Sequence, residues 1–175
     1  ESGLYELDPK TETVRCYFSV KGDSLSLPDS RIKAILEDEK GRLWVGCHKE
    51  GWCLLDRENR TFKQYKPDEI LGRKTNERAL NDPTTFHFSE PYLWVGTLDK
   101  LIRFHPETEE TKYYDFCANQ PVYDENREQK PITGLLDIFE DSDGKFWITT
   151  YLREPYIFVF DPKTGDCEKL ETPTL

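Results

Sequence analysis

The residue types best suited to chemistry in this 175-residue chain are its histidines and cysteines. Cys47 and His48, followed by Cys53, look like half of a zinc site, because thiolates and imidazoles at short spacing are common Zn²⁺ ligands. A zinc site needs further ligands, and no second pair follows at ligand spacing. The sequence therefore predicts no metal site and no cofactor. The thiols are expected to be free and mostly buried. A disulfide between Cys47 and Cys53 is the alternative.

The sequence also shows no catalytic arrangement. No Ser stands in a nucleophile elbow, and no Cys and His are set at an obvious catalytic spacing. No Gly-rich nucleotide loop is visible, and no His has the helical context of a phospho-acceptor. We therefore expect that this segment is not an enzyme.

Composition excludes further classes of function. The formal net charge is −10, and the Lys and Arg residues alternate with Asp and Glu instead of clustering. Such a chain repels phosphate groups, so nucleic acids and anionic membranes are not expected as partners. Hydrophobic residues make up 36% and aromatic residues 13%, which favours one folded domain with a core over a disordered or membrane-embedded chain.

An internal repeat organises the chain and must position any site. Short apolar strands with a tryptophan recur at Leu43–Gly46, Leu93–Gly96 and Phe146–Thr149, at a spacing of about 50 residues. An acidic turn with a glycine precedes the first and the third. A second apolar strand that ends in Asp or His follows each of them.

A second repeated stretch adds a fourth copy at the N-terminus. The copies start with Asp or His and align without gaps, from Asp8, Asp56, His105 and Asp161. Nine positions later they carry Tyr17, Tyr65, Tyr114 and Leu170. Four matching copies of a turn followed by a strand indicate a repeat architecture.

These repeats predict the fold. Each contains four short strands separated by Gly, Asp, Asn and Pro, as in antiparallel hairpins, and only one turn around Asp68–Leu71 has a helical character. Four-stranded units at this spacing predict an all-β fold, a β-propeller of about three and a half blades. The predicted parts are 1–20, a half blade with the two outer strands, and three blades at 30–66, 83–117 and 132–172, together forming one partial propeller domain.

The repeated tryptophans are predicted to form the core. A blade has two apolar faces that neighbouring blades must cover, and an indole is large enough to fill the gap between sheets. We therefore expect Trp44, Trp94 and Trp147 to be buried, with ligand stacking as the alternative role. Trp52 departs from the repeat, and is expected either to extend the core or to face a ligand.

The segment from Ile32 to Gly46 contains Glu37-Asp38, Gly41 and Leu43-Trp44-Val45-Gly46 in an order that resembles the two-component regulator propeller repeat. The segment 138–148 matches nearly as well, whereas Ser89–Tyr92 replaces the acidic turn in the middle unit. The resemblance covers almost the whole chain.

This resemblance implies a function and a location. Such repeats form the periplasmic part of bacterial hybrid histidine kinases, inner-membrane proteins whose kinase and regulator modules lie in the cytoplasm. The chain would then be a fragment of a larger, seven-bladed propeller. Ligand sensing, often of oligosaccharides, and dimerisation of the parent protein are implied, and the remaining blades would be partners missing from this chain.

A ligand site is expected in two sets of loops. In propellers, the loops between blades and those between the second and third strands of a blade form the binding face. A sugar needs aromatic faces against its C–H side and planar polar groups for its hydroxyls. The residues that offer this chemistry there are Trp52, Asn76, Tyr123, Arg127, Tyr151 and Arg153.

Two other functions fit a propeller. A lyase of the streptogramin-inactivating type would use a His and a metal, for which His48 and His87, with Glu50 nearby, are the candidates. A protein–protein scaffold would present an exposed apolar patch on one rim. Stoichiometric bound metal would favour the lyase over a sensor.

Overall fold

The computed structural model describes residues 2–70, 80–98, 100–115, 122–123, 129–130, 134–150 and 156–170. In this part the chain is β-structure apart from one helical turn, α1 (Pro67–Ile70), which lies where the sequence indicated a turn. Contacts divide the chain into two compact units, Glu1–Pro83 and Thr84–Leu175.

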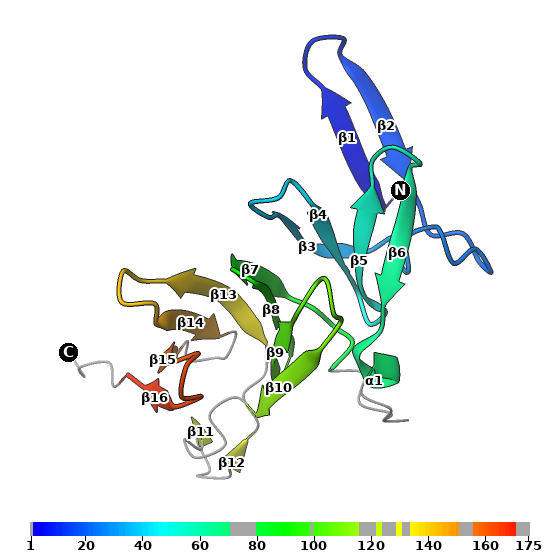
Figure 1. The fold of residues 1–175 in the computed structure, drawn as a ribbon. Helices are drawn as coiled ribbons and strands as arrows, with labels where there is room; N and C mark the ends of the chain where they lie inside the picture. Colours follow the sequence, from blue (N-terminus) through cyan, green and yellow to red (C-terminus); the bar gives the residue numbers. More distant parts are fainter. Residues whose placement is uncertain are drawn as a thin grey trace. The chain divides into compact units, whose positions relative to one another are not determined.

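The first unit contains a hairpin and a four-stranded sheet (Figure 1). The hairpin pairs β1 (Leu4–Asp8) with β2 (Thr13–Tyr17). Every strand of the sheet pairs antiparallel with the next strand along the chain. The strands are β3 (Ile32–Glu37), β4 (Leu43–Cys47), β5 (Gly51–Asp56) and β6 (Thr61–Tyr65).

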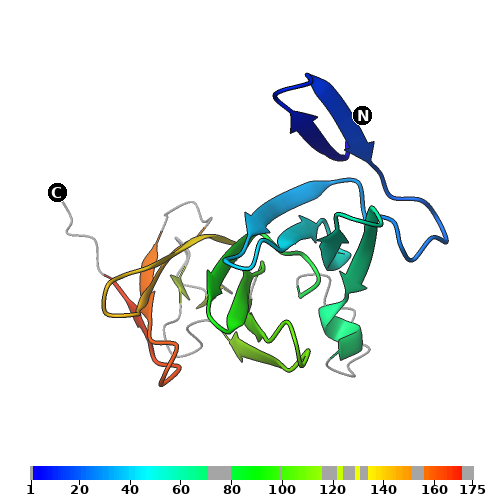
Figure 2. The same ribbon diagram turned by 45° about the horizontal axis from the view of Figure 1, so that its top comes forward.

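The second unit contains two sheets of the same kind, which Figure 2 shows from a second direction. The first consists of β7 (Thr85–Ser89), β8 (Tyr92–Gly96), β9 (Lys100–Phe104) and β10 (Thr111–Asp115). The second consists of β13 (Leu135–Glu140), β14 (Phe146–Thr150), β15 (Ile157–Phe160) and β16 (Cys167–Lys169). A small pair joins β11 (Val122–Tyr123) to β12 (Gln129–Lys130).

These sheets are the blades of a partial β-propeller, so the predicted fold class is confirmed. Each of the segments 30–66, 83–117 and 132–172 contains one four-stranded antiparallel meander, and 1–20 contains the hairpin. That these parts form one domain stays a prediction.

The acidic turn and the tryptophan that follows it form one hydrogen-bonded unit. In the first sheet, Asp38 Oδ1 accepts the N–H groups of Lys40 and Arg42, both at 3.0 Å. Asp38 Oδ2 accepts from the indole Nε1 of Trp44 at 2.9 Å. Gly41 closes the turn with a φ of 74°, which suits a residue without Cβ. The Asp of this motif therefore caps the turn and fixes the indole at once.

The last sheet repeats this arrangement. Asp141 Oδ1 accepts from the backbone N–H groups of Asp143 and Lys145, at 2.9 and 3.0 Å. Its Oδ2 accepts from Trp147 Nε1 at 2.7 Å. The hydrogen bond between Trp147 and Asp141 spans the turn. The length of the turn therefore sets the number of residues between the Asp and the Trp of the motif.

The four stretches that align without gaps in the sequence are the turn of the hairpin and the turns between the third and fourth strands of the three sheets. In each turn the first residue accepts two backbone N–H groups, through Asp Oδ1 or through Nδ1 of His105. The fifth residue of each turn has a left-handed backbone: Glu12, Arg60, Glu109 and Gly165, with φ between 55° and 84°. A fixed acceptor and a fixed backbone shape explain why the four copies have the same length.

In the first unit, one face of the sheet packs against the hairpin. Val45, Cys53 and Phe62 on the sheet join Leu4 and Tyr17 of the hairpin in a single buried cluster. Tyr17 and Phe62 meet edge to face with their centroids 5.5 Å apart. Burial of these side chains holds the two pieces together.

In the second unit, the two sheets pack face to face. Trp94 lies at the centre of this interface, with its ring centroid 4.9 Å from that of Phe146 and 5.9 Å from that of Phe160. On its own sheet it stacks on Tyr114. This is the role that the sequence predicted for the repeated indole.

The prediction of a buried indole is right for two tryptophans and wrong for the third. Trp44 is 0% exposed and Trp94 is 2% exposed, but Trp147 is 40% exposed. Trp147 lies on the face of the last sheet that is opposite the packed one, where its indole donates to Asp141. A core position in a stacked fold needs a second sheet above it, which the repeat pattern alone does not guarantee.

The cysteines also differ from expectation. Cys47 and Cys53 are free and buried, as predicted, but Cys16 is free and exposed on β2. Cys167 on β16 is disulfide-bonded, so the expectation of free thiols is wrong for this residue. Wide spacing along the chain does not prevent a bridge, because folding brings distant residues together.

Candidate ligand-binding site

Three segments of the first unit converge at the end of the sheet where β4 passes to β5 (Figure 1). They are the β4–β5 loop at 48–50, the connection 18–31 from the hairpin, and residues 80–83 that lead out of the unit. Propeller ligand sites are expected at such loop ends. We therefore take this end of the sheet as the candidate site.

Asp82 holds two of these segments together. Its side chain is 1% exposed and accepts hydrogen bonds from three groups of other segments. Oδ2 accepts from Lys33 Nζ at 2.9 Å, and Oδ1 accepts from the Lys49 N–H at 3.2 Å. His48 Nδ1 lies 3.2 Å from Oδ1 and must carry the proton, because a carboxylate only accepts. The hydrogen bonds that Asp82 accepts from His48 and Lys49 fix the loop that carries His48.

A β-bulge accounts for the position of Lys33. The pairing of β3 with β4 shifts between Ile32 and Ala34, so Lys33 is the extra residue of the bulge. Bulges turn a side chain out of the regular alternation and are frequent beside functional sites. Here the bulge accompanies the contact between Lys33 and the buried Asp82.

Arg31 and Asp29 form a second fixed pair at this end. Arg31 donates through Nε and through its terminal nitrogen to the two oxygens of Asp29, at 3.0 and 2.7 Å. The guanidinium of Arg31 thereby lowers the pKa of Asp29, although partial burial alone would raise it. The Arg31 carbonyl accepts from the His48 N–H at 2.9 Å, which ties this pair to the β4–β5 loop.

Gly51 explains why the loop returns so tightly. Its φ is 82°, and a Cβ at this position would lie 2.2 Å from the carbonyl oxygen of Tyr65. Its N–H donates to the Asn81 carbonyl at 2.7 Å. Lys49 also has a left-handed backbone, with a φ of 60°. This loop geometry therefore requires glycine at position 51.

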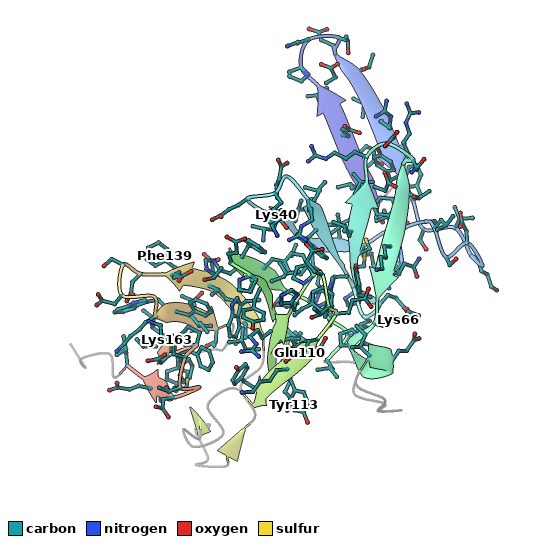
Figure 3. The ribbon with its side chains drawn as sticks, viewed as in Figure 1. Lys40, Lys66, Glu110, Tyr113, Phe139 and Lys163 are labelled. Atoms are coloured by element: carbon teal, nitrogen blue, oxygen red, sulfur yellow. The ribbon has the colours of Figure 1, made fainter. Side chains whose placement is uncertain are left out.

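Beside this loop lies a hollow of about 550 Å³, between the connection from the hairpin and the ends of β5 and β6. Glu50 and Lys66 form an ion pair on its wall, with 3.3 Å between Nζ and Oε2. Figure 3 labels Lys66, which follows β6. Ser19, Ser24, Gln64 and Leu27 also line it.

The walls of the hollow are held by hydrogen bonds. Ser26 Oγ accepts the Val20 N–H at 2.9 Å, which closes the connection on itself. Gln64 Nε2 donates to the Ser26 carbonyl at 2.8 Å, and the Phe62 N–H donates to Leu25 at 2.8 Å. These hydrogen bonds shape an open depression lined mainly by polar groups, which is the candidate place for a small polar ligand.

Of the predicted ligand-binding residues, only Trp52 has a side chain in the described part of the structure. Trp52 is 0% exposed and stacks on Tyr65, so it is a core residue and not a surface platform. The backbone of Tyr123 lies on β11, but its side chain is outside the described part. The other predicted residues lie outside the described residues: Asn76, Arg127, Tyr151 and Arg153.

Sequence reasoning missed the residues that build this end of the sheet. Lys33 and Asp82 are 49 positions apart, and a chain pattern does not show that they meet. Glu50 and His48 had been noted, but only as candidate metal ligands. The lone Asp before Pro83 was the available signal, since Asp-Pro often opens a turn.

The geometry gives no support to a metal centre in the described residues, where no group of three His, Cys, Asp or Glu could hold an ion. His48 pairs with Asp82, and His87 Nε2 lies 2.9 Å from Glu140. Across the same residues, no helix has the length and apolar character needed to cross a membrane.

Solved structures with the same fold define the class of protein as a β-propeller. The extracellular domain of the hybrid two component system BT3049 from B. thetaiotaomicron is 18% identical, with a TM-score of 0.70 over 95% of this chain and 20% of that one. The corresponding domain of BT4673 from the same organism is 16% identical, with a TM-score of 0.69 over 99% and 20%.

Within that class, residues 26–49 match the family model described as two component regulator propeller. The resemblance seen in the sequence is thereby confirmed for the segment that contains β3 and β4. No curated protein matches the chain. The chain spans about a fifth of the length of the two solved chains.

Proposed function

We propose that this chain is part of an extracytoplasmic sensor propeller of a two-component system, and that it binds a ligand without catalysis. The observation that carries the proposal is the preformed polar hollow at the loop end of the first sheet. The match of residues 26–49 and the likeness in fold to the extracellular domains of two hybrid two component systems support the class of system. A kinase would belong to the parent protein, and dimerisation of that parent stays a prediction.

A periplasmic location is supported by the cysteines. Disulfides persist in oxidising compartments and are rare in the cytosol, and Cys167 is disulfide-bonded. Alkaline phosphatase fused to the parent protein within this propeller should be active, because that enzyme also needs an oxidising compartment. An inactive but intact fusion would contradict the location.

The proposed ligand is an oligosaccharide. The hollow offers hydroxyls from Ser19 and Ser24, the amide of Gln64 and the pair of Glu50 with Lys66. Such groups can exchange hydrogen bonds with sugar hydroxyls. The volume suits one or two sugar residues.

Binding of a panel of neutral and acidic oligosaccharides, measured by saturation-transfer NMR and calorimetry, tests the proposal. Lys66→Ala and Glu50→Gln should each weaken the binding about tenfold, as loss of one charged hydrogen bond does. Lys10→Ala, in the exposed turn of the hairpin, is the matched control and should bind normally. Full affinity in both site variants would place the ligand elsewhere, and no binding by any sugar would refute the ligand class.

A further inference from the structure

A second hollow adjoins the one at the candidate site. The first hollow is the one of about 550 Å³, and the second measures about 480 Å³ and lies along β6, the edge strand of the first sheet. Three residues, Ser24, Gln64 and Lys66, line both hollows, so the two share one wall. The residues that line only the second hollow are Leu25, Asp56, Thr61, Phe62, Lys63 and Glu69.

Lys66 stands between the two hollows. Its Nζ lies 3.3 Å from Oε2 of Glu50, which lines the first hollow, and 3.9 Å from Oε1 of Glu69, which lines the second. Figure 3 shows Lys66 where β6 leads into α1. The side chain of Lys66 is 33% exposed, so a ligand in either hollow can reach the same ammonium group.

Backbone hydrogen bonds fix the walls of the second hollow. The Phe62 N–H donates to the Leu25 carbonyl at 2.8 Å and joins the connection from the hairpin to the edge of the sheet. The Ile70 N–H donates to the Lys66 carbonyl at 3.0 Å and closes the turn of α1. The Leu25 side chain is 56% exposed, so it offers an apolar surface on which the C–H side of a sugar ring can pack.

The charges around the two hollows are balanced. Among the described residues, each hollow is lined by as many basic as acidic side chains. The charged residues of both linings are Lys21, Asp23, Glu50, Asp56, Lys63, Lys66 and Glu69. Because cations are not in excess, the linings do not favour a carboxylate or sulfate on the ligand. Carboxylates accept hydrogen bonds from hydroxyl groups, so a neutral ligand rich in hydroxyls is the better match.

We propose that the two hollows form one extended site, in which a neutral oligosaccharide passes from the first hollow to the second over Lys66. The inference rests on the proposed function and adds to it a second subsite and a preference for length. The two volumes are similar, so each hollow should hold about one or two sugar residues. A disaccharide therefore fills one hollow, whereas a tetrasaccharide is needed to fill both.

A length series tests the extended site. Malto-, cello- and xylo-oligosaccharides of two to six residues are titrated into the chain by calorimetry, with oligogalacturonides of the same lengths as the acidic counterpart. For a neutral series that binds, affinity should rise about tenfold from the disaccharide to the tetrasaccharide and change little beyond it. The acidic series should bind more weakly at every length.

Two variants isolate the second hollow. Leu25→Ser removes an apolar side chain but keeps the backbone contact to Phe62, and Glu69→Gln removes a charge. Each should weaken tetrasaccharide binding about fivefold and leave the disaccharide, which we place in the first hollow, unaffected. Leu7→Ser, at a side chain that is 62% exposed on the hairpin, and Glu58→Gln, in the turn after β5, are the matched controls and should bind both normally.

The outcomes separate this inference from the proposed function. Equal affinity at all lengths, with Lys66→Ala weakening each of them, would overturn the extended site and leave the proposed function standing. Tighter binding of the acidic series than of the neutral one would overturn the assignment of a neutral ligand. If no series binds at any length, the proposed function fails and the second subsite fails with it.

Discussion

The carboxylate of Asp38 links local and tertiary structure in the first sheet. One oxygen caps the turn, and the other binds the indole of Trp44 and the Arg42 side chain at 2.6 Å. Burial by itself would raise the pKa of Asp38, but the hydrogen bonds from Trp44 and Arg42 outweigh it and lower the pKa below its ordinary value. The group is therefore more acidic in the folded than in the unfolded chain.

A dependence of stability on pH follows from this shift. A carboxyl whose pKa is lower in the folded state stabilises the fold above its unfolded pKa, and the contribution is lost as the pH falls through the folded value. Asp38→Asn should cost about 1–3 kcal/mol at pH 7. The difference from the native chain should shrink as the pH is lowered below about 4.

Urea denaturation at several pH values from 7 to 3 measures this difference. Asp143→Asn, which changes an exposed carboxylate in a turn, serves as the control and should leave the profile unchanged. A difference that stays constant down to pH 3 would show that the charge of Asp38 is not what stabilises the turn.

Arg60 is a second residue with a measurable effect. Its φ of 59° lies in the left-handed region, where a side chain costs about 1 kcal/mol or more, and the equivalent residue in the last sheet is Gly165. Arg60→Gly should stabilise the chain by about 0.5–1 kcal/mol, after the extra freedom of the unfolded glycine is subtracted. Glu58→Gly, in the same turn, should instead destabilise. Equal losses in both variants would contradict the strain.

At the scale of the elements, the two tryptophans of the second unit give a matched pair. Trp94→Ala removes an indole packed on three aromatic rings and should cost about 3–5 kcal/mol. Trp147→Ala removes a half-exposed indole and should cost less than about 1.5 kcal/mol. Chemical denaturation of both variants decides this, and similar losses would mean that Trp147 is covered in solution.

The strands themselves could be predicted well from the sequence, because short apolar runs bounded by Gly, Asp and Pro repeat with constant spacing. The turn at Asp56 and its copies followed from the gapless alignment. The bulge at Lys33 could not be predicted, since an extra residue in a strand leaves no regular signal. The exposure of Trp147 was missed for another reason, because burial depends on which sheet lies above a face.

The candidate site was less accessible to sequence reasoning. Aromatic and planar polar residues were chosen by type, and for Trp52 the burial of the indole fits the core alternative of its prediction. The network of Asp82 joins residues from three separate segments, and only folding brings them together. The order of the strands predicted a loop between the second and third strands of each sheet, and in the first sheet this loop spans 48–50; that it binds a ligand stays a prediction.

At the scale of the whole molecule, the cysteines report on folding and oxidation together. Among the described cysteines, only Cys16 should react rapidly with iodoacetamide in the native chain, because Cys47 and Cys53 are buried and Cys167 is disulfide-bonded. The hydrogen bond to Cys47 and burial also raise the pKa of Cys53. Denaturation should add Cys47 and Cys53, and Cys167 should be labelled only after reduction. Peptide mass mapping checks the order, and labelling of Cys167 without reductant would contradict the bridge.

The face of the last sheet that carries Trp147 is partly exposed, and this affects the order in which the chain unfolds. In β8, Leu93, Trp94 and Val95 are all buried, so both sides of that strand are covered, whereas β14 is covered on one side only. Stacked repeats that touch only their neighbours lose their outermost layer first. Amide protons of β14 should therefore exchange with deuterium sooner than those of β8, because the last sheet should unfold before the sheet that contains β8.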